Sequence, residues 1–267
     1  MEKLINNYHT HTYRCGHAVG TDEEYVLAAI KKGIKVLGFT DHVPYPDRPQ
    51  EGIRQNTETM IGYLESINAL KEKYKDQIEI HIGYEIEYLS EMKWWYEELL
   101  NSGKVEYFIL GQHLMMEDGK LVWFHYDETT NMRLMADRII EGARSGLVKY
   151  ICHPDFFMCS WTEGNIEQYK RILQAAEECD IPIELNMQGV RKGYRSNPNN
   201  IHETQMRYDD EPKYPYLKFW ELASHYNVKV IIGGDYHDPV DILYDSEKIC
   251  FEIVKMFNLN LIDKIDI

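Results

Sequence analysis

Hydrophobic and polar residues alternate along the whole chain in two periods. Short runs rich in β-branched and aromatic residues are separated by longer stretches with apolar residues at helical spacing, the pattern of repeated strand–helix units around a parallel sheet. The runs predict seven strands, at 4–11, 36–42, 78–88, 107–113, 150–155, 182–188 and 228–237. The spacing between them predicts helices over 22–32, 55–75, 90–101, 130–145, 165–179, 213–226 and 240–257. The sequence therefore predicts an α/β fold.

Local signals refine this outline. A capping box, Thr21-Asp22-Glu23-Glu24, predicts the start of the first helix. Two longer segments, 114–130 and 189–212, are expected to be loops, the second covering or edging a site. No linker, low-complexity segment or internal repeat divides the chain, so we expect one domain over 1–267, a length near that of a single α/β barrel.

Composition and charge exclude several classes of partner. With 29 Lys and Arg against 44 Asp and Glu, the net charge of −15 disfavours binding to a nucleic-acid polymer. No apolar run approaches the roughly 18 to 20 residues of a membrane span, and polar residues interrupt the N-terminus too early for a signal peptide. Five cysteines without close pairs indicate a reducing compartment. We expect a cytoplasmic protein with no membrane partner.

Side chains able to bind a metal stand at the end of nearly every predicted strand. They are His9, His11, Asp41, His42, Glu85, Glu87, His113, His153, Asp155, Asp235 and His237. Residues two apart on a strand face the same side, and the C-terminal strand ends of a parallel barrel ring one face, where active sites are built. A lone histidine at such a position is more often structural, but so many at one end would each need a separate partner in a crowded core. The pattern favours a metal site.

The remaining histidines and the absent motifs narrow the chemistry. His81, His202 and His225 fit structural roles better, while His125 could reach the site. Cys15 could be a thiolate ligand, although an unpaired loop cysteine is more often inert. Glycine-rich nucleotide-binding motifs and a GxSxG nucleophile elbow are both absent from the sequence. This argues against dinucleotide, P-loop nucleotide and serine hydrolase chemistry.

Five runs together resemble one family, the polymerase and histidinol phosphatase (PHP) superfamily, and within it the histidinol-phosphate phosphatases. The runs are 9–11, 14–18, 38–42, 83–88 and 233–237, so the resemblance spans practically the whole chain. It implies a distorted (β/α)7 TIM-like barrel with the metal site at the C-terminal ends of the strands, in agreement with the seven predicted strands. It also implies a phosphoric monoester hydrolase that converts L-histidinol phosphate to L-histidinol and phosphate in histidine biosynthesis.

The resemblance further implies three divalent metal ions and their ligands. The first would be held by His9, His11, Glu85 and Asp235; the second by Glu85, His113 and His153; the third by His17, His42 and His237. The choice of Glu85 over Glu87 follows the family pattern. Imidazole and carboxylate donors suit Zn, Fe, Mn or Co alike. A metal-bound hydroxide would be the nucleophile that attacks the phosphomonoester.

Three further residues are candidates for handling the substrate. Arg191 and Arg195 follow the sixth predicted strand and could bind phosphate or be solvated loop cations; the family segment favours Arg191. Asp41 could protonate the leaving alkoxide, orient His42 or cap a turn. Family members often carry an arginine shortly after the histidine that is His153 here, and residues 154–161 hold none, which leaves open what replaces it.

Two alternatives remain open. Another phosphoesterase of the superfamily could act on nucleotides or other small phosphoesters, because a net negative charge does not exclude a small nucleotide. A non-catalytic metal-binding barrel is the second alternative, in which the metals would be coordinatively closed. The oligomeric state and the identity of the metals are open as well.

Overall fold

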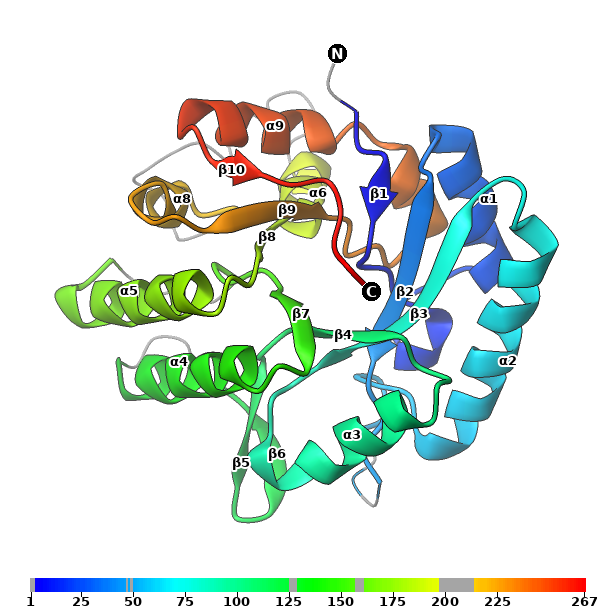
Figure 1. The fold of residues 1–267 in the computed structure, drawn as a ribbon, viewed down its shortest axis with the longest axis horizontal. Coiled ribbons are helices and arrows are strands. Elements are labelled where there is room, and N and C mark those ends of the chain that lie inside the picture. Colours follow the sequence, from blue (N-terminus) through cyan, green and yellow to red (C-terminus); the bar gives the residue numbers. More distant parts are fainter. Residues whose placement is uncertain (1–2, 47, 49, 125–128, 157–160, 197–213) are drawn as a thin grey trace.

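A curled parallel sheet forms the centre of the computed structural model, which describes residues 3–46, 48, 50–124, 129–156, 161–196 and 214–267 (Figure 1). Its eight strands lie in chain order: β1 (Asn6–Asn7), β2 (Val36–His42), β3 (Glu79–Ile86), β4 (Tyr107–Leu110), β7 (Val148–Ile151), β8 (Ile183–Asn186), β9 (Lys229–Gly233) and β10 (Asn260–Leu261). All neighbours pair in parallel. Chain order and parallel pairing are what repeated strand–helix units predict.

The two ends of the sheet approach each other and close a distorted barrel. Beyond β1 and β9, Thr10 bridges Tyr236 in parallel, and the His11 backbone N–H donates to the Tyr236 carbonyl at 2.9 Å. At the opposite end β10 pairs with β9, and Asn6 Nδ2 donates to the Asp263 carbonyl at 2.8 Å. The seven predicted strands therefore form the expected TIM-like barrel, and the short β10, which the sequence did not reveal, joins it at the N-terminal end.

Helices cover the outside of this sheet (Figure 1). They are α1 (Asp22–Lys32), α2 (Thr57–Tyr74), α3 (Lys93–Asn101), α4 (Thr129–Arg144), α5 (Glu163–Glu178), α8 (Leu217–Ala223) and α9 (Glu247–Met256). Three 3-10 turns accompany them: Tyr13–Cys15, Ser90–Met92 and Pro239–Leu243. The predicted capping box is confirmed, since Thr21 Oγ1 accepts from the Glu24 backbone N–H while the Glu24 carboxylate accepts from the Thr21 N–H.

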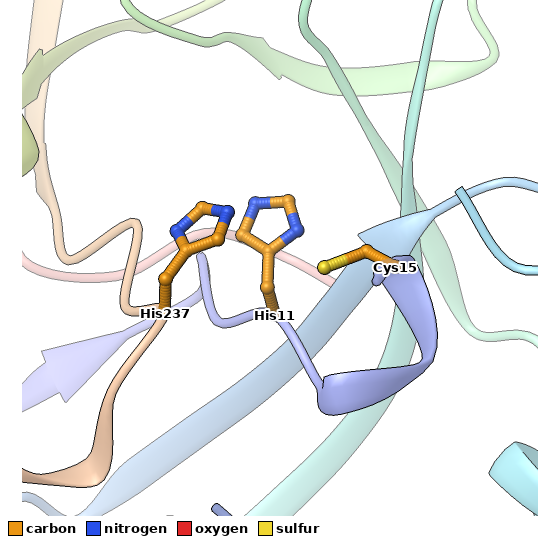
Figure 2. Close-up of side chains that lie close together, drawn as sticks. All are labelled: His11, Cys15 and His237. Carbon is orange, nitrogen blue, oxygen red and sulfur yellow. The ribbon is translucent and has the colours of Figure 1, made fainter. Parts of the chain in front are cut away.

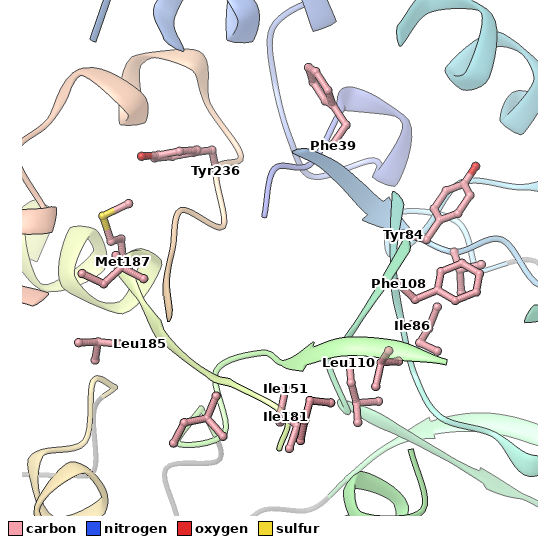
Figure 3. Packing of buried hydrophobic residues seen from close by; sticks show 14 of the residues in the cluster. Phe39, Tyr84, Ile86, Phe108, Leu110, Ile151, Ile181, Leu185, Met187 and Tyr236 are labelled. Atoms are coloured by element: carbon pink, nitrogen blue, oxygen red, sulfur yellow. The ribbon is translucent and has the colours of Figure 1, made fainter. Parts of the chain in front are cut away.

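Two hydrophobic clusters fill the two sides of the strands. Outward residues such as Phe39, Tyr84 and Leu185 pack between the sheet and the helices (Figure 3). A smaller cluster lines the barrel interior: Tyr8, Val36, Tyr107, Ile109, Tyr150, Cys152, Ile231 and Ile265. Because Ile265 of the C-terminal segment belongs to this inner cluster, apolar packing closes the N-terminal half of the barrel and leaves the other end for polar groups. No described helix is long and apolar enough to cross a membrane.

The two segments expected to be loops are partly ordered, which corrects the sequence-based prediction. The first contains an antiparallel hairpin, β5 (Leu114–Glu117) and β6 (Lys120–Trp123). The second opens with α6 (Met187–Ser196), which starts directly after β8, and residues 197–213 lie outside the described residues. Buried Met187 and Val190 anchor α6 one turn apart, and the Asn186 side chain accepts from the Gln188 backbone N–H at 2.8 Å.

Candidate metal centre

A cavity of about 400 Å³ opens at the C-terminal ends of the strands. Eight of the predicted ligands line it: His11, His17, His42, Glu85, His113, His153, Asp235 and His237. The ninth, His9, is fully buried directly behind them, with its ring centroid 5.2 Å from that of His11. The structure thus brings all nine side chains into one place, although they come from segments spread over most of the chain.

The first predicted group converges at the closure of the barrel. His9 Nε2 and His11 Nε2 lie 3.2 Å apart, and His11 Nε2 is 3.2 Å from Asp235 Oδ1. A Glu85 oxygen, Oε2, lies 3.5 Å from His11 Nε2 and 3.7 Å from His9 Nε2. Two imidazole nitrogens therefore face two carboxylate oxygens around a common point.

Glu85 connects this group to the second. Its other oxygen, Oε1, lies 2.9 Å from His153 Nε2 and 3.9 Å from His113 Nε2. The carboxylate has room because position 111 is glycine: a Cβ atom there would collide with the Glu85 side chain. One carboxylate with its two oxygens turned toward different imidazoles has the geometry of a bridge between two cations.

The third group stands at the rim. One ligand atom each of His17, His42 and His237 lie within 4.8 Å of one another. The rings of His237 and His11 stack with centroids 4.1 Å apart, and Figure 2 shows them side by side with Cys15 on the far side of His11. Burial, together with the charge of Asp41, raises the pKa of the Cys15 thiol to about 12, so this group favours its neutral form.

The two carboxylates keep their charge despite burial. Burial alone would raise the pKa of Glu85, but the nearby His42 and hydrogen bonds from His153 and His9 hold it well below its ordinary value. The pKa of Asp235 is likewise held well below its ordinary value, since His9 and His11 outweigh the effect of burial. The centre therefore contains fixed negative charge that attracts cations.

The histidines divide into two electrostatic classes. Burial lowers the pKa of His42 and His237 well below the ordinary value, which favours the neutral imidazole that binds metals. At His9 burial is outweighed by Glu184 and Asp235, so that its pKa lies well above the ordinary value. Acidic groups that stabilise a proton there stabilise a metal cation in the same way.

The donor set fits a cluster of transition-metal ions. Imidazole nitrogens and carboxylate oxygens are ligands for Zn, Fe, Mn and Co. His9 Nε2 and His11 Nε2 lie close together beside the Asp235 carboxylate, and these three groups would hold a cation. The three groups described above would then hold three such ions.

Two buried acids support the ligands from behind: Glu184, which was not predicted from the sequence, and Glu87, which was considered there but not assigned to a metal. Glu184 Oε1 lies 2.8 Å from His9 Nδ1, and its other oxygen accepts from the His153 backbone N–H at 3.1 Å. Glu87 Oε1 lies 3.1 Å from His113 Nδ1. Carboxylates that bind the second nitrogen of a metal-ligating histidine fix its ring and tautomer. A buried acid inside an apolar strand, as in Ile183-Glu184-Leu185, was the available signal.

Of the roles considered for Asp41, the structure favours orientation of a ligand, and Asp155 has a structural position. Neither is among the described residues that line the cavity. Asp41 accepts from the Thr12 hydroxyl and lies 3.7 Å from His11 Nδ1, a position for orienting a ligand rather than for protonating a leaving group. Asp155 accepts from the Tyr216 backbone N–H and from Trp220 Nε1, each at 2.7 Å, so it ties β7 to α8.

Cationic residues of α6 border the cavity. Arg191 is buried, and its Nη2 donates to the carbonyls of Gly234 and Asp235 at 2.7 and 2.8 Å, while Nη1 has no hydrogen-bond partner within the described part of the chain. Lys192 also lines the cavity, and the sequence analysis did not select it. Burial lowers the pKa of Lys192, as does the neighbouring Arg191 charge. The side chain of Arg195 lies outside the described residues.

Of the histidines not predicted as ligands, His81 is described and does not line the cavity. His81 pairs with Glu106 and Glu79 at the start of β3, the structural role expected for it. His125 and His202 lie outside the described residues.

Comparison with known proteins places this fold and centre in one class. A sequence model of the PHP domain matches residues 7–188. A probable histidinol-phosphatase of Deinococcus radiodurans is 31% identical over 241 residues, which cover 88% of this chain and 86% of that protein. The chain therefore belongs to the PHP domain family.

Two further proteins of the same kind are similar over nearly their full length. The histidinol-phosphatase of Bacillus subtilis is 23% identical over 273 residues, covering 90% of this chain and 96% of that protein. The crystal structure of the Lactococcus lactis histidinol phosphate phosphatase, complexed with Zn, L-histidinol and phosphate, matches with a TM-score of 0.70 at 18% identity and covers 100% of both chains. The chain is accordingly a phosphatase of the PHP family, a phosphoric monoester hydrolase.

Proposed function

We propose that this enzyme hydrolyses L-histidinol phosphate to L-histidinol and phosphate, with three divalent metal ions held by the nine ligands. The observation that carries the proposal is the sharing of Glu85 between two imidazole groups at the floor of a cavity, with cations of α6 at its edge. This arrangement suits a phosphate ester: Arg191 and Lys192 place positive charge at one edge of the cavity, and the acidic floor would attract metals.

Each part of the centre has a task in this reaction. The metal ions would supply Lewis acidity and activate water near neutral pH. Arg191 is fixed through Nη2 by the carbonyls of Gly234 and Asp235 and through an ion pair of Nε with Asp241 at 3.3 Å, and we infer that its buried Nη1, which has no hydrogen-bond partner among the described residues, would donate to a phosphoryl oxygen. Lys192 supplies a second positive charge at the same edge. We infer that Lys192 takes over the role of the arginine that is absent after His153.

The support around the ligands sets their orientation. Glu184 and Glu87 accept from the Nδ1 atoms of His9 and His113, which turns the Nε2 atoms toward Glu85. We infer that Asp41 does the same for His11. Zinc is the first ion to test, because the similar Lactococcus structure contains it. The names of two relatives, both histidinol-phosphatases, also support L-histidinol phosphate as the substrate.

A comparison of substrates tests the proposal. Phosphate release by metal-replete protein is measured on L-histidinol phosphate, a nucleoside monophosphate, a simple alkyl phosphate and a phosphodiester. The expected result is that kcat/KM is highest for L-histidinol phosphate and that the diester is not cleaved. A higher kcat/KM for the nucleotide would transfer the function to another phosphoesterase of the superfamily. Absence of hydrolysis of every ester would favour a metal-binding barrel without catalysis.

A further inference from the structure

One side of the cavity is aromatic rather than ionic. Trp123 and Phe156 line it, and both contact the ligand His113, with ring centroids 6.0 and 5.3 Å away. Phe156 in turn packs edge-to-face against Tyr214 at 5.1 Å. Trp123 and Phe156 thus form an aromatic wall beside His113, and Phe156 also contacts His153; Tyr214, which is not among the described residues that line the cavity, packs against Phe156.

Trp123 has a surface position that the fold does not require. It is the last residue of β6, in a hairpin that pairs with no strand of the main sheet, and 47% of its surface is exposed. The hairpin is attached through other residues, since Leu114 is fully buried and Met115, Met116 and Leu121 pack against the core. A large aromatic side chain at the edge of a polar cavity is thus available to cover a ligand.

The cavity therefore has walls of two kinds. Arg191 and Lys192 belong to α6, whereas Trp123 belongs to the hairpin after β4, and both elements line the same cavity. When the phosphoryl group of an ester binds at the metal ligands and the α6 cations, the alcohol part of the ester is left to contact the aromatic wall. Flat π-systems are the groups that bind best to a tryptophan face.

We propose that Trp123 and Phe156 form the subsite for a flat heteroaromatic ring in the leaving alcohol, with Trp123 as its specificity-determining residue. The inference rests on the proposed function, for which this ring is the imidazole of L-histidinol. Tyr214 supports the wall by packing against Phe156 and is itself fixed, since its hydroxyl donates to Gln188 Oε1 at 2.6 Å.

A pair of substrates that differ only in the ring tests the subsite. O-phosphoethanolamine has the amino alcohol phosphate of L-histidinol phosphate without the imidazolylmethyl group. The measured quantity is the ratio of kcat/KM for L-histidinol phosphate to that for O-phosphoethanolamine, in metal-replete protein. Trp123→Ala should lower this ratio by roughly threefold to thirtyfold, and Trp123→Phe should restore most of it, because a ring remains.

Trp94→Ala is the matched control, since Trp94 is 52% exposed on α3 and does not line the cavity. It should leave the ratio at the wild-type value. As a measurement independent of turnover, Trp123→Ala should weaken the binding of L-histidinol in calorimetry by a similar factor. An unchanged ratio with unchanged L-histidinol binding in Trp123→Ala would overturn the subsite.

The proposed function and the subsite can fail separately. If the enzyme does not hydrolyse L-histidinol phosphate but hydrolyses other monoesters, the proposed substrate is wrong. The ratio is then measured for 2-phenylethyl phosphate against ethyl phosphate, which again differ by a ring. A threefold or greater fall of that ratio in Trp123→Ala supports the aromatic subsite, and an unchanged ratio refutes it.

Discussion

Glu85 lies close to imidazoles from all three predicted metal groups. Its two oxygens lie within 2.9 and 3.1 Å of His153 Nε2 and His42 Nδ1, and they also face the first group. Glu87 is two residues further along and equally buried, yet it lies behind His113 and accepts from the backbone N–H groups of His113 and Leu114. We therefore propose separate tasks for the two acids: metal coordination for Glu85 and support of His113 for Glu87.

Substitution of these acids tests this division. Glu85→Gln keeps the shape but removes the charge between the groups, so metal content and kcat should both fall, by more than the tenfold to hundredfold typical of lost ligand support. Glu87→Gln should cause the smaller loss. Elemental analysis and kinetics of both variants measure this. A silent Glu85→Gln beside a damaging Glu87→Gln would show that the wrong carboxylate was assigned to the bridge.

Glu184 is the support with the largest expected effect on a single ligand. Its carboxylate faces His9 Nδ1 inside the core, and Gly233 opposite leaves the space, because a Cβ there would collide with Glu184. We expect Glu184→Gln to lower metal affinity tenfold to hundredfold, measured by competition with a chelator of known affinity. The matched control is Glu106→Gln, which breaks a similar histidine–carboxylate pair away from the cavity and should leave metal affinity unchanged.

Arg191 is predicted to bind the phosphoryl group. Arg191→Lys keeps a positive charge but cannot hold the carbonyls of Gly234 and Asp235 and reach phosphate at once. kcat/KM should fall about tenfold to hundredfold, equivalent to about 1.5 to 3 kcal/mol, and inorganic phosphate should inhibit more weakly. Arg171→Ala, which removes a surface ion pair with Asp137, is the control. Wild-type kcat/KM together with wild-type phosphate inhibition in Arg191→Lys would exclude this role.

At the scale of the residue, strand periodicity was enough to predict the candidate metal ligands. It did not predict the acids that hydrogen-bond to those ligands. Strand periodicity predicted that His9 would face the same way as His11, and Asp235 the same way as His237. The members of each pair do lie close together, but they follow β1 and β9, which end at Asn7 and Gly233. Glu184 could not be assigned to His9, since the two are 175 positions apart and only the closed barrel makes them neighbours. The same limit affected Asp41, whose partner Thr12 lies on another segment.

At the scale of the element, the long periodic segments were predicted well and the short ones were not. α1 agrees with its prediction at both ends because the capping box and Gly33 mark them. α6 was expected to be a loop, since its glycines and arginines are typical of one; its helix depends on the burial of Val190 and Arg191 against the sheet. The β5–β6 hairpin and β10 are too short for a periodic signal.

Glu106 connects three elements and gives a pH-dependent contribution to stability. It accepts from Lys71 of α2 and pairs with His81 of β3, each at 2.6 Å, just before β4 begins. Burial would raise the pKa of Glu106, but His81 and Lys71 hold it at about 2, below the ordinary 4.5. Because the pKa is lower in the folded state, this stabilisation is present above pH 4.5 and is lost as the pH falls toward 2.

The prediction is that Glu106→Gln lowers the free energy of unfolding by about 1.5 to 3 kcal/mol at pH 6. The difference from wild type should shrink as the pH falls from 4.5 to 3. Urea unfolding of both proteins across this range measures it. A difference that stays constant with pH would mean that packing, not the charge of Glu106, is what the substitution removes.

At the scale of the whole molecule, the closure of the barrel creates the centre. Thr10 and Tyr236 join the segments that follow β1 and β9, which brings the His9–His11 segment beside Asp235. Apolar packing fills the opposite half of the barrel, so the polar end can concentrate fixed charge without loss of the core. The chain has a net charge of −15, and within its described part histidines and carboxylates converge in this cavity, where their negative charge favours cations.

The central claim is that this convergence is a metal-dependent phosphatase centre, and metal removal tests it most directly. Phosphate release from L-histidinol phosphate is measured on metal-replete protein, after stripping with a chelator, and after single divalent ions are added back, with metal content determined at each stage. We predict three ions per chain in the active protein, loss of turnover on stripping, and recovery with one or more of Zn, Fe, Mn or Co. Full turnover by protein verified to be metal-free would contradict the account.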